Sequence, residues 1–541
     1  MKDGVVLLAD RYAARPPAGR QADEVESRPP TVLIRSPYGR TGVWGLAYGR
    51  SLAERGFQVI VQSVRGTFGS GGQFTPMRDE RDDGLATVAW IRQQPWFGDR
   101  LASSGISYLG YVQWAIADDA GLDALCLQAT TSSFADSTYD GAAFSLRLSL
   151  GWTGQVSRQG GRLGRLRSLA PPRELAQSLD HLPLRDGDQA LLGKHVGFYQ
   201  DWLTHGPDDE YWTSQSHTAR VASVAVPVSM RTGWYDIFLP WMLRDYATLA
   251  AAGNPPRLTI GPWAHTSTGL FTGVARETVR FLSETLLDTP ARTSKPVTYY
   301  VTGAGPGAGE WRDADTWPPA GVQEQVWSLA AKGELMFGAA ASGPAPTGPA
   351  TSGTAMSGTP AGPGAEPGTS AFRYDPADPT PSVAGPDLTD TDPSVDNREL
   401  EVRPDVLVFT STRLRDPLEV TGTPRALITV SADNPYHDVF VRLCDVAPDG
   451  ASLNVCDRLV RLDNVAPGPD GTRLAVLELW PTAHRFAAGH RIRVQVSGGA
   501  HPRYARNPGT GESLADAVRT VVSTVTVHHG ISTITLPVSP R

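Results

Sequence analysis

The chain has 541 residues, a length that predicts roughly three to four domains of ordinary size. Hydrophobic residues make up 40% and charged residues 19% of the sequence, as in an ordinary globular protein, and no run approaches the ~18 consecutive apolar residues of a membrane span. The formal net charge is −7 and the arginines form no cluster, so neither a nucleic acid nor a membrane is indicated as a partner.

The N-terminal segment and the cysteines bear on the compartment. The first residues, MKDGVVLLADRY, lack the apolar core of a secretory signal, and we expect a cytoplasmic enzyme whose chain begins inside its first strand. The cysteines at positions 126, 444 and 456 are widely spaced and predict neither a disulfide framework nor a zinc site. Cys444 and Cys456 can pair only if folding brings them together, and we expect separate buried thiols.

Residues 1–135 alternate short apolar runs with helical patterns. Three runs are typical of buried strands: PTVLIR (30–35), GFQVIVQSV (56–64) and RLASSG (100–105). Helical periodicity covers residues 41–56 and 81–96 between them. Strands separated by helices of this length predict βαβ units and a parallel sheet, the first part of an α/β core.

The next stretch, residues 136–220, has a different composition. It is rich in Leu, Arg, Gly and Gln, has a helical pattern over 188–203 and contains no convincing strand, which predicts an inserted helical cap. The runs VPVSMRTGWYD and PRLTIGPWAH then return with a helical pattern between them, so residues 221–294 are predicted to form the second part of the α/β core.

Residues 295–541 predict an all-β domain. Their short β-branched runs are bounded by turn residues and have no helical pattern between them, as in a β-sandwich. Within this region, residues 338–370 hold one charged side chain, Glu366, and little besides Gly, Ala, Pro, Ser and Thr. Because such a segment cannot bury a core, we expect a disordered surface insertion there.

The stretch SSGISYLGY (103–111) carries a candidate nucleophile, Ser107. It differs from the elbow motif G-x-S-x-G because Leu109 stands at the second glycine and Gly110 follows one place later. A strand precedes the serine and a helical pattern follows it, which is the context that an elbow needs. The alternative is that glycine and serine simply mark a turn here.

A serine nucleophile needs a base and an acid that orients the base. In α/β hydrolases the chain order is Ser, Asp, His, each on a loop after a strand. Asp236 and His265 follow the two strands of the resumed sheet in that order. Asp236 alone could cap the following helix, and His265 alone could be a polar loop residue, but together with Ser107 they predict a catalytic triad.

Further aromatic residues are candidates for the oxyanion hole and the pocket. The backbone N–H of Tyr108 and the phenol of Tyr38, in the loop RSPYGR, could hold the oxyanion. Phe238 and Trp263 lie two residues from the candidate acid and base, and Trp152 of the cap could cover the acyl group. Plain packing is the alternative for the Tyr38 phenol and for these three aromatic residues.

Motifs along nearly the whole chain then point to a family. The segments are ADRYAARP, IRSPYGR, VRGTFGSGG, GISYLG, GWYDIF, GPWAH, DPADPTPSVAG and HPRYARNPGTG. In this combination and order the chain resembles the CocE/NonD serine hydrolases, a family of cocaine esterase-like enzymes, acylases and α-amino-acid ester hydrolases that is related to Xaa-Pro dipeptidyl-peptidases. The resemblance implies an α/β-hydrolase core, an inserted helical cap and a C-terminal jelly roll.

The resemblance also implies roles for matched residues. The family's G-x-S-Y-x-G motif places the nucleophile at Ser107, its W-Y-D motif the acid at Asp236, and its G-P-W-x-H motif the base at His265. The tyrosine of its S/N-P-Y loop, Tyr38 here, is the side-chain oxyanion donor. Two features depart from the family: Ser63 stands where an acidic residue is usual in Q-D-x-R-G, and the N-terminus starts later than is typical.

These observations predict a serine hydrolase that cleaves small-molecule carboxylic esters through an acyl-enzyme, without metal or cofactor. One alternative is a Xaa-Pro dipeptidyl-peptidase or an amide-cleaving acylase with the same triad. A dipeptidyl-peptidase must bind a free α-amine, for which Asp208, Asp209 and Glu210 of the cap are candidates, unless they form an ordinary exposed turn. Another alternative is a non-catalytic protein whose β-sandwich binds a glycan or a partner.

Overall fold

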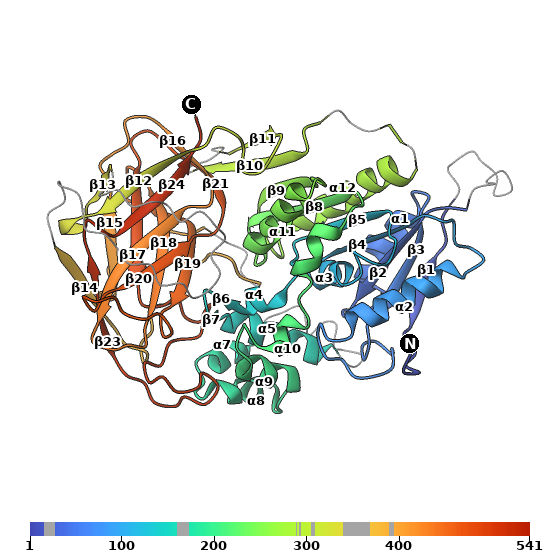
Figure 1. Cartoon of the computed structure of the whole chain (residues 1–541), viewed down its shortest axis with the longest axis horizontal. Coiled ribbons are helices and arrows are strands. Elements are labelled where there is room, and N and C mark those ends of the chain that lie inside the picture. Colours follow the sequence, from blue (N-terminus) through green and yellow to red (C-terminus); the bar gives the residue numbers. More distant parts are fainter. Residues whose placement is uncertain are drawn as a thin grey trace.

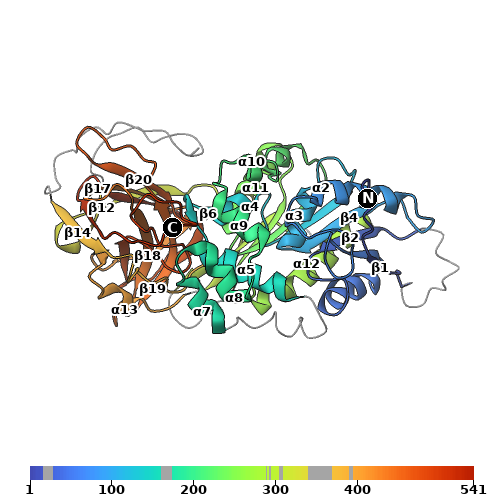
Figure 2. The ribbon, with the colours of Figure 1, turned by 90° about the horizontal axis from the view of Figure 1, so that it is seen from below.

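The computed structural model describes residues 1–15, 28–159, 173–287, 289–290, 294–303, 309–338, 368–388 and 394–540. The molecule is elongated, with an α/β part at one end and a β-rich part, coloured yellow to red, at the other (Figure 1). The helices of the inserted segment lie between these two ends, as the view from below also shows (Figure 2). This three-part arrangement confirms the predicted fold class.

A parallel sheet forms the centre of the α/β part. Its strands are β2 (Thr31–Ser36), β3 (Gln58–Ser63), β4 (Leu101–Ile106), β5 (Ala124–Gln128), β8 (Val228–Tyr235) and β9 (Arg257–Ala264). Hydrogen bonding gives the order β3-β2-β4-β5-β8-β9, and β1 (Ala9–Tyr12) joins antiparallel at β3. The order places β4, β5, β8 and β9 side by side, each ending at the same edge of the sheet.

Helices cover both faces of this sheet because both sides of its strands are apolar. In β2, Leu33 belongs to one core cluster and its neighbours Val32 and Ile34 to another, as the alternation of side chains along a strand requires. The second cluster contains the π-helical turn η2 (Gly45–Arg50), α1 (Ser51–Ala53) and α12 (Thr268–Leu286). The first contains residues of α2 (Glu80–Arg92), α3 (Tyr108–Trp114) and α11 (Leu239–Ala251).

The described residues of the inserted segment form helices and one short β-hairpin. Its elements are α4 (Phe134–Thr138), β6 (Tyr139–Asp140), β7 (Ala143–Phe144), α5 (Leu146–Arg158), α7 (Arg173–Leu179), η3 (Leu184–Asp186), α8 (Gly187–Leu192), α9 (Gly197–Thr204), α10 (Glu210–Thr213) and η4 (Thr218–Ser223). The β6–β7 hairpin was not predicted, because strands of two residues carry no alternation to detect. The helical pattern over 188–203 corresponds to two helices, α8 and α9, because Gly193, at φ 71°, ends α8 before α9 begins.

The C-terminal part is a sandwich of two sheets. Its elements are β10 (Val297–Gly303), β11 (Glu310–Ala314), β12 (Gln323–Leu329), η5 (Ala331–Gly333), β13 (Leu335–Phe337), β14 (Thr369–Tyr374), α13 (Arg398–Glu401), β15 (Val406–Thr410), β16 (Leu418–Gly422), β17 (Arg425–Ala432), β18 (Asp438–Val446), β19 (Ser452–Arg461), β20 (Arg473–Glu478), β21 (Thr482–Phe486), β22 (Arg491–Ser497), β23 (Ser523–His528) and β24 (Thr533–Val538). One sheet has the order β15-β22-β18-β19, and β17 is central in the other. Apolar residues of β17 and β18 share one core.

Two of the predicted boundaries, at residue 294 and around the insertion 338–370, can be compared with the elements of the structure. β10 pairs with β9 of the parallel sheet and, further along, with β21, so it connects the two parts directly after the predicted boundary at 294. The division of the chain at 135, 220 and 294 stays a prediction. Most of the predicted disordered insertion, residues 339–367, lies outside the described residues, and β14 begins at Thr369, within the predicted span.

The cysteines lie as the sequence predicted, buried and unpaired. Cys444 faces Asn454 across the β18–β19 pair, whereas Cys456 faces Leu443. Burial raises the pKa of the Cys126, Cys444 and Cys456 thiols above the ordinary value, which keeps these residues protonated.

The described residues hold neither a candidate membrane span nor a candidate metal site. Among their helices, none combines the length and the apolar character that crossing a bilayer requires. Nor do three or more His, Cys, Asp or Glu side chains of these residues gather as metal ligands would.

Candidate active site

The candidate triad lies at the carboxyl edge of the parallel sheet. Ser107 follows β4, Asp236 follows β8 and His265 follows β9. Strands β4, β5, β8 and β9 are consecutive neighbours, so three residues far apart in sequence come to one edge. Such an edge is the usual place for a site in an open α/β sheet.

Ser107 occupies a strained turn between β4 and α3. Its backbone has φ 61° and ψ −126°, in the left-handed region that residues other than glycine seldom adopt. The Ser107 N–H donates to the carbonyls of Gln128 (2.9 Å) and Ala129 (3.1 Å), and its own carbonyl accepts from Thr130 Oγ1 (2.8 Å). The end of β5 therefore holds this turn, and backbone strain held in this way is common at functional sites.

The position of the glycines explains the departure from G-x-S-x-G. A Cβ at Gly105 would lie 2.3 Å from the Cβ of Leu109, so this position cannot carry a side chain. A Cβ at Gly110 would lie 2.5 Å from the Cβ of Thr130, which shows where α3 passes closest to the loop after β5. Leu109 itself is fully buried in the core. The close approach thus falls one residue later than the motif specifies.

Asp236 and His265 form a buried pair. His265 Nδ1 lies 2.8 Å from Asp236 Oδ2, and Asp236 Oδ1 accepts the N–H of Phe238 at 2.8 Å. The carboxylate thus accepts a backbone N–H in the turn before α11, whose N-cap residue, Phe238, has no side-chain cap hydrogen bond, so the interpretation of Asp236 as a helix cap is wrong. The hydrogen bonds of the described residues do not include a direct one between Ser107 and His265.

Tyr38 lies beside the candidate nucleophile. Its phenol oxygen accepts the indole N–H of Trp152 at 3.0 Å and is also hydrogen-bonded to the Ser107 side chain. Burial raises the pKa of Tyr38 to about 12, so the phenol keeps its proton at neutral pH and can donate it in a hydrogen bond. The ring stacks on Trp44 at 5.6 Å, and the Tyr38 N–H donates to Ser36 Oγ.

The Tyr108 side chain is fixed by a buried charged network that the sequence did not reveal. Its hydroxyl donates to Glu80 Oε1 (2.8 Å) and accepts the N–H of Met77 (2.7 Å), while Glu80 pairs with Arg35 at 2.7 Å. Burial, followed by the Glu80 charge, raises the pKa of Tyr108 well above its ordinary value. No acceptor for the backbone N–H of Tyr108 occurs among the described residues, as expected at the first turn of a helix.

Aromatic side chains of the insertion, together with Phe74 of the core, cover this network. Trp152, on α5, stacks nearly parallel on Tyr108 at a centroid distance of 6.0 Å and on Trp202 at 5.7 Å. Phe74 and Phe198 pack against Trp152, at 6.3 and 5.9 Å. The role of Trp152 as a cover of the acyl group stays a prediction, and the other rings were not predicted, because no local pattern distinguishes them from core residues.

The two other pocket candidates have different surroundings. Phe238 packs edge-on against His265 at 5.4 Å, beside the candidate base. The ring of Trp263 instead lies under the guanidinium of Arg231 at 4.0 Å and against Trp311 at 5.6 Å. These contacts of Trp263 are those of packing, and its role in binding stays a prediction.

The acidic turn of the cap is solvent-exposed. Asp208, Asp209 and Glu210 are all exposed, and the Asp209 carboxylate accepts the Tyr211 N–H at 2.7 Å, which caps α10. Asp209 also pairs with His205 at 3.2 Å. These contacts are those of the ordinary exposed turn.

Arg40 contacts Ser63, the serine that stands where the family usually has an acidic residue. Arg40 Nη1 donates to Ser63 Oγ at 3.3 Å and to the Phe68 carbonyl at 2.7 Å. The charge of Arg40 is paired by Asp10 on β1, at 3.1 Å. A carboxylate from another strand thus neutralises the arginine that contacts Ser63.

An α/β sheet with a serine on a strained turn and a histidine–aspartate pair at the same edge defines the class of serine hydrolases. Residues 3–267 match the model of the X-Pro dipeptidyl-peptidase (S15) family, and residues 291–533 match its C-terminal non-catalytic domain. The chain is 30% identical to cocaine esterase of Rhodococcus sp. (strain MB1 Bresler), over 95% of this chain and 92% of that one. It belongs to the CocE/NonD family of serine hydrolases.

Solved structures agree on the fold. An aminopeptidase from a marine sediment archaeon, Thaumarchaeota archaeon, superposes with a TM-score of 0.80 at 22% identity, over 100% of this chain and 95% of that one. An α-amino acid ester hydrolase gives a TM-score of 0.77 at 23% identity, over 99% and 95%. At these identities the likeness concerns the architecture of core, insertion and C-terminal β domain.

Proposed function

We propose that this protein is a carboxylesterase in which Ser107, His265 and Asp236 act as a catalytic triad. The hydrogen bond between His265 Nδ1 and Asp236 Oδ2, at the edge of the sheet where Ser107 sits in its strained turn, carries the proposal. Ser107 Oγ attacks the ester carbonyl carbon and its proton passes to His265 Nε2. The alcohol leaves with that proton, and water then hydrolyses the acyl-enzyme by the same route in reverse.

Two donors hold the negative charge that develops on the carbonyl oxygen. The Tyr38 phenol is protonated at neutral pH and is hydrogen-bonded to Ser107, so it can donate to an oxyanion formed there. The backbone N–H of Tyr108 is the second donor. Fixed donors of this kind need no reorganisation as charge develops, and the mechanism uses neither metal nor cofactor.

The surroundings favour an ester with an apolar acyl or alcohol group. Phe238, Phe134 and Trp152 surround the candidate residues with aromatic surface. The acidic turn considered for α-amine recognition is exposed, and Asp209 there is occupied as a helix cap. The name of the cocaine esterase relative also fits ester cleavage, whereas the Xaa-Pro dipeptidyl-peptidase or acylase alternative requires a site for an amine or an amide. A cytoplasmic location stays a prediction.

A fluorophosphonate probe and paired substrates test the proposal. We expect the probe to label the wild-type protein at Ser107, as peptide mapping can show, and to leave Ser107→Ala unlabelled. We expect p-nitrophenyl esters to be hydrolysed with a higher kcat/KM than an Ala-Pro anilide of the same leaving-group class. Absence of labelling in the wild type would favour the non-catalytic alternative, and preference for the anilide would favour the peptidase.

A further inference from the structure

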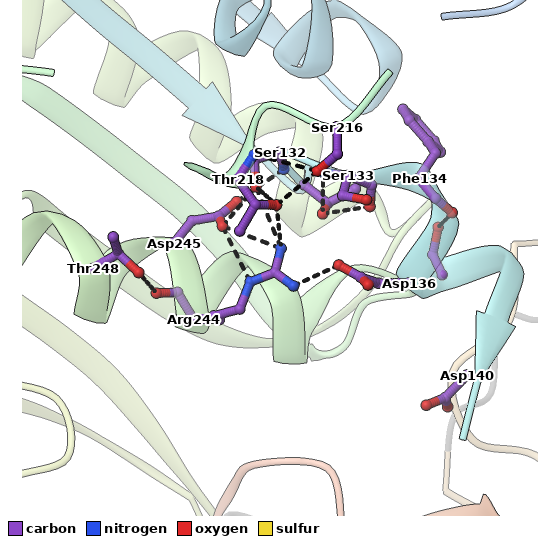
Figure 3. Close-up of polar contacts among 12 residues, drawn as sticks. Ser132, Ser133, Phe134, Asp136, Asp140, Ser216, Thr218, Arg244, Asp245 and Thr248 are labelled. Carbon is purple, nitrogen blue, oxygen red and sulfur yellow. Dashed lines mark hydrogen bonds and ion pairs between the residues drawn. The ribbon is translucent and has the colours of Figure 1, made fainter. Parts of the chain in front are cut away.

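The inserted segment leaves and rejoins the core through two short stretches that lie together. We call residues 132–138, which include α4, and residues 215–218, which end at the first residue of η4, the neck. The two stretches are hydrogen-bonded to each other, since the N–H of His217 donates to the Ser132 carbonyl at 2.9 Å. Both meet α11 (Figure 3), the helix that begins at Leu239, three residues after the candidate acid Asp236.

Asp245 of α11 holds the outgoing stretch. Its Oδ2 accepts the backbone N–H of Ser132 and its Oδ1 accepts the Ser132 hydroxyl, both at 2.8 Å. The side chain is 1% exposed, so these hydrogen bonds form away from water. A carboxylate that accepts two donors from one residue fixes both the position and the orientation of that residue.

Arg244, the preceding residue, connects both stretches. Its Nη1 donates to Asp136 Oδ2 at 2.5 Å, and its Nη2 donates to Thr218 Oγ1 at 3.2 Å and to Ser132 Oγ at 3.3 Å (Figure 3). The same nitrogen lies 3.3 Å from Asp245 Oδ1. One guanidinium therefore joins the outgoing stretch, the returning stretch and the helix, a geometry that its planar fork of donors permits and a lysine would not.

The neck reaches the candidate active site through aromatic contacts. Phe134 lies between the two anchored positions Ser132 and Asp136, and its ring packs edge-on against Phe238 at 5.3 Å. Phe238 in turn packs against His265 at 5.4 Å.

Phe134 and the returning stretch also contact the helix that follows Ser107. Phe134 lies 5.8 Å from Tyr108 and 5.0 Å from Tyr111, both on α3. The Tyr111 hydroxyl donates to the carbonyl of Gln215 at 2.6 Å. Displacement of the neck would therefore move rings next to the base and next to the nucleophile.

The Asp245 carboxylate is costly to bury, while 36% of the Arg244 side chain stays exposed, which argues that the value of this pair is not stability alone. Burial raises the pKa of Asp245 to about 6 even though Arg244 and the Ser132 donors favour the ionised form. Buried ion pairs contribute little net stability compared with apolar packing of similar volume, but removal of one partner leaves an unpaired charge. A pair with these properties fits a role in fixing the position of the neck on α11.

We propose that Arg244 and Asp245 are positioning residues of the candidate active site: they anchor both stretches of the neck on α11 and thereby set Phe134 against Phe238 and the base His265. The consequence is a defined aromatic wall for the acyl group of the substrate. The proposal rests on the proposed esterase function, since the wall has a role in selectivity only if an ester is cleaved at Ser107.

The experiment compares two p-nitrophenyl esters, a benzoate that needs the wall and an acetate that does not. In Asp245→Asn and Arg244→Met we expect kcat/KM for the benzoate to fall on the order of ten- to a hundredfold, mainly through KM, and to fall much less for the acetate. Arg244→Lys keeps the charge but not the fork of donors. Its kcat/KM for the benzoate should lie between the values of Arg244→Met and the wild type.

Glu401→Gln in the C-terminal part is the matched control. Glu401 is likewise a buried carboxylate that pairs with an arginine, Arg493, and accepts a serine hydroxyl, Ser452 Oγ at 2.6 Å. This variant should lower the melting temperature and leave the benzoate-to-acetate ratio unchanged. Equal losses on both esters in the neck variants, or a changed ratio in Glu401→Gln, would overturn the proposal.

Amide hydrogen exchange gives a second measurement that does not depend on catalysis. We expect faster exchange within residues 132–138 and 215–218 of Asp245→Asn and Arg244→Lys, with strands β4 and β9 unchanged. Unchanged exchange in the neck would contradict the anchoring even if activity falls. If instead the wild type hydrolyses neither ester while the neck variants show the exchange change, the proposed function fails and the anchoring stands.

Discussion

Two serines at the ends of neighbouring strands differ in what surrounds their hydroxyls. Ser107, after β4, has a left-handed backbone at φ 61° and its side chain is hydrogen-bonded to the Tyr38 phenol. Ser132, in the loop after β5, donates its hydroxyl to Asp245, and Thr218 and Arg244 also lie within hydrogen-bond distance. Both residues are serines that follow a strand of the parallel sheet. Their hydrogen-bond partners therefore distinguish the candidate nucleophile, Ser107, from the anchor, Ser132.

The carboxylates beside these serines differ in the same way. Asp236 pairs with the imidazole of His265, whereas Asp245 pairs with the guanidinium of Arg244. An imidazole has a second ring nitrogen that can serve as a general base, and a guanidinium has donors only. The difference teaches that the partner of a buried carboxylate distinguishes a candidate catalytic pair from an anchoring pair.

The largest expected effect separates the two serines. Ser107→Ala should lower kcat for p-nitrophenyl acetate on the order of 10⁴-fold or more, because the attacking atom is removed. Ser132→Ala should keep most of this turnover and lose ~1–3 kcal/mol of unfolding free energy, because the buried Asp245 carboxylate loses the hydrogen bond from the Ser132 hydroxyl to its Oδ1. Steady-state kinetics and urea denaturation measure the two quantities. Similar kinetic losses in both variants would remove the distinction.

Tyr38→Phe is expected to have the second-largest effect. Loss of one oxyanion donor should lower kcat by about 10²–10³-fold with little change in KM, since the interaction forms mainly in the transition state. Trp152→Phe is the control, because it removes the indole N–H that Tyr38 accepts and keeps an aromatic ring. Its effect on kcat should be smaller, and an unchanged rate in Tyr38→Phe would exclude the phenol from the mechanism.

The smallest expected effect concerns the dependence of stability on pH. The pKa of Asp245 is about 6 in the folded protein and near 3.8 when unfolded, so folding favours the protonated carboxyl. The contribution of Asp245 to the unfolding free energy is therefore present below about pH 4 and is lost as pH rises through about 6. The difference in unfolding free energy between wild type and Asp245→Asn, measured from pH 4 to 8, isolates this contribution, since other groups titrate alike in both. A flat difference would contradict the raised pKa.

Much of the fold could be predicted because its signals are local. The strands at 31–36, 58–63 and 101–106 coincide with short runs rich in apolar or small residues, and the order of Ser107, Asp236 and His265 follows from counting strands and helices. The β6–β7 hairpin and the break at Gly193 were missed, because two-residue strands and a single left-handed glycine leave no periodic trace.

The sequence by itself determined the class of fold, the family and the candidate residues of the triad and the oxyanion hole, because these depend on periodicity, chain order and motifs that lie within a few residues. Only the tertiary structure decided which aromatic residues meet at the site and which charged residues hold them. The Glu80–Tyr108 bond joins residues 28 positions apart, and the Ser132–Asp245 bond joins residues 113 positions apart. Contacts over such separations arise from the packing of whole elements, which no local pattern encodes.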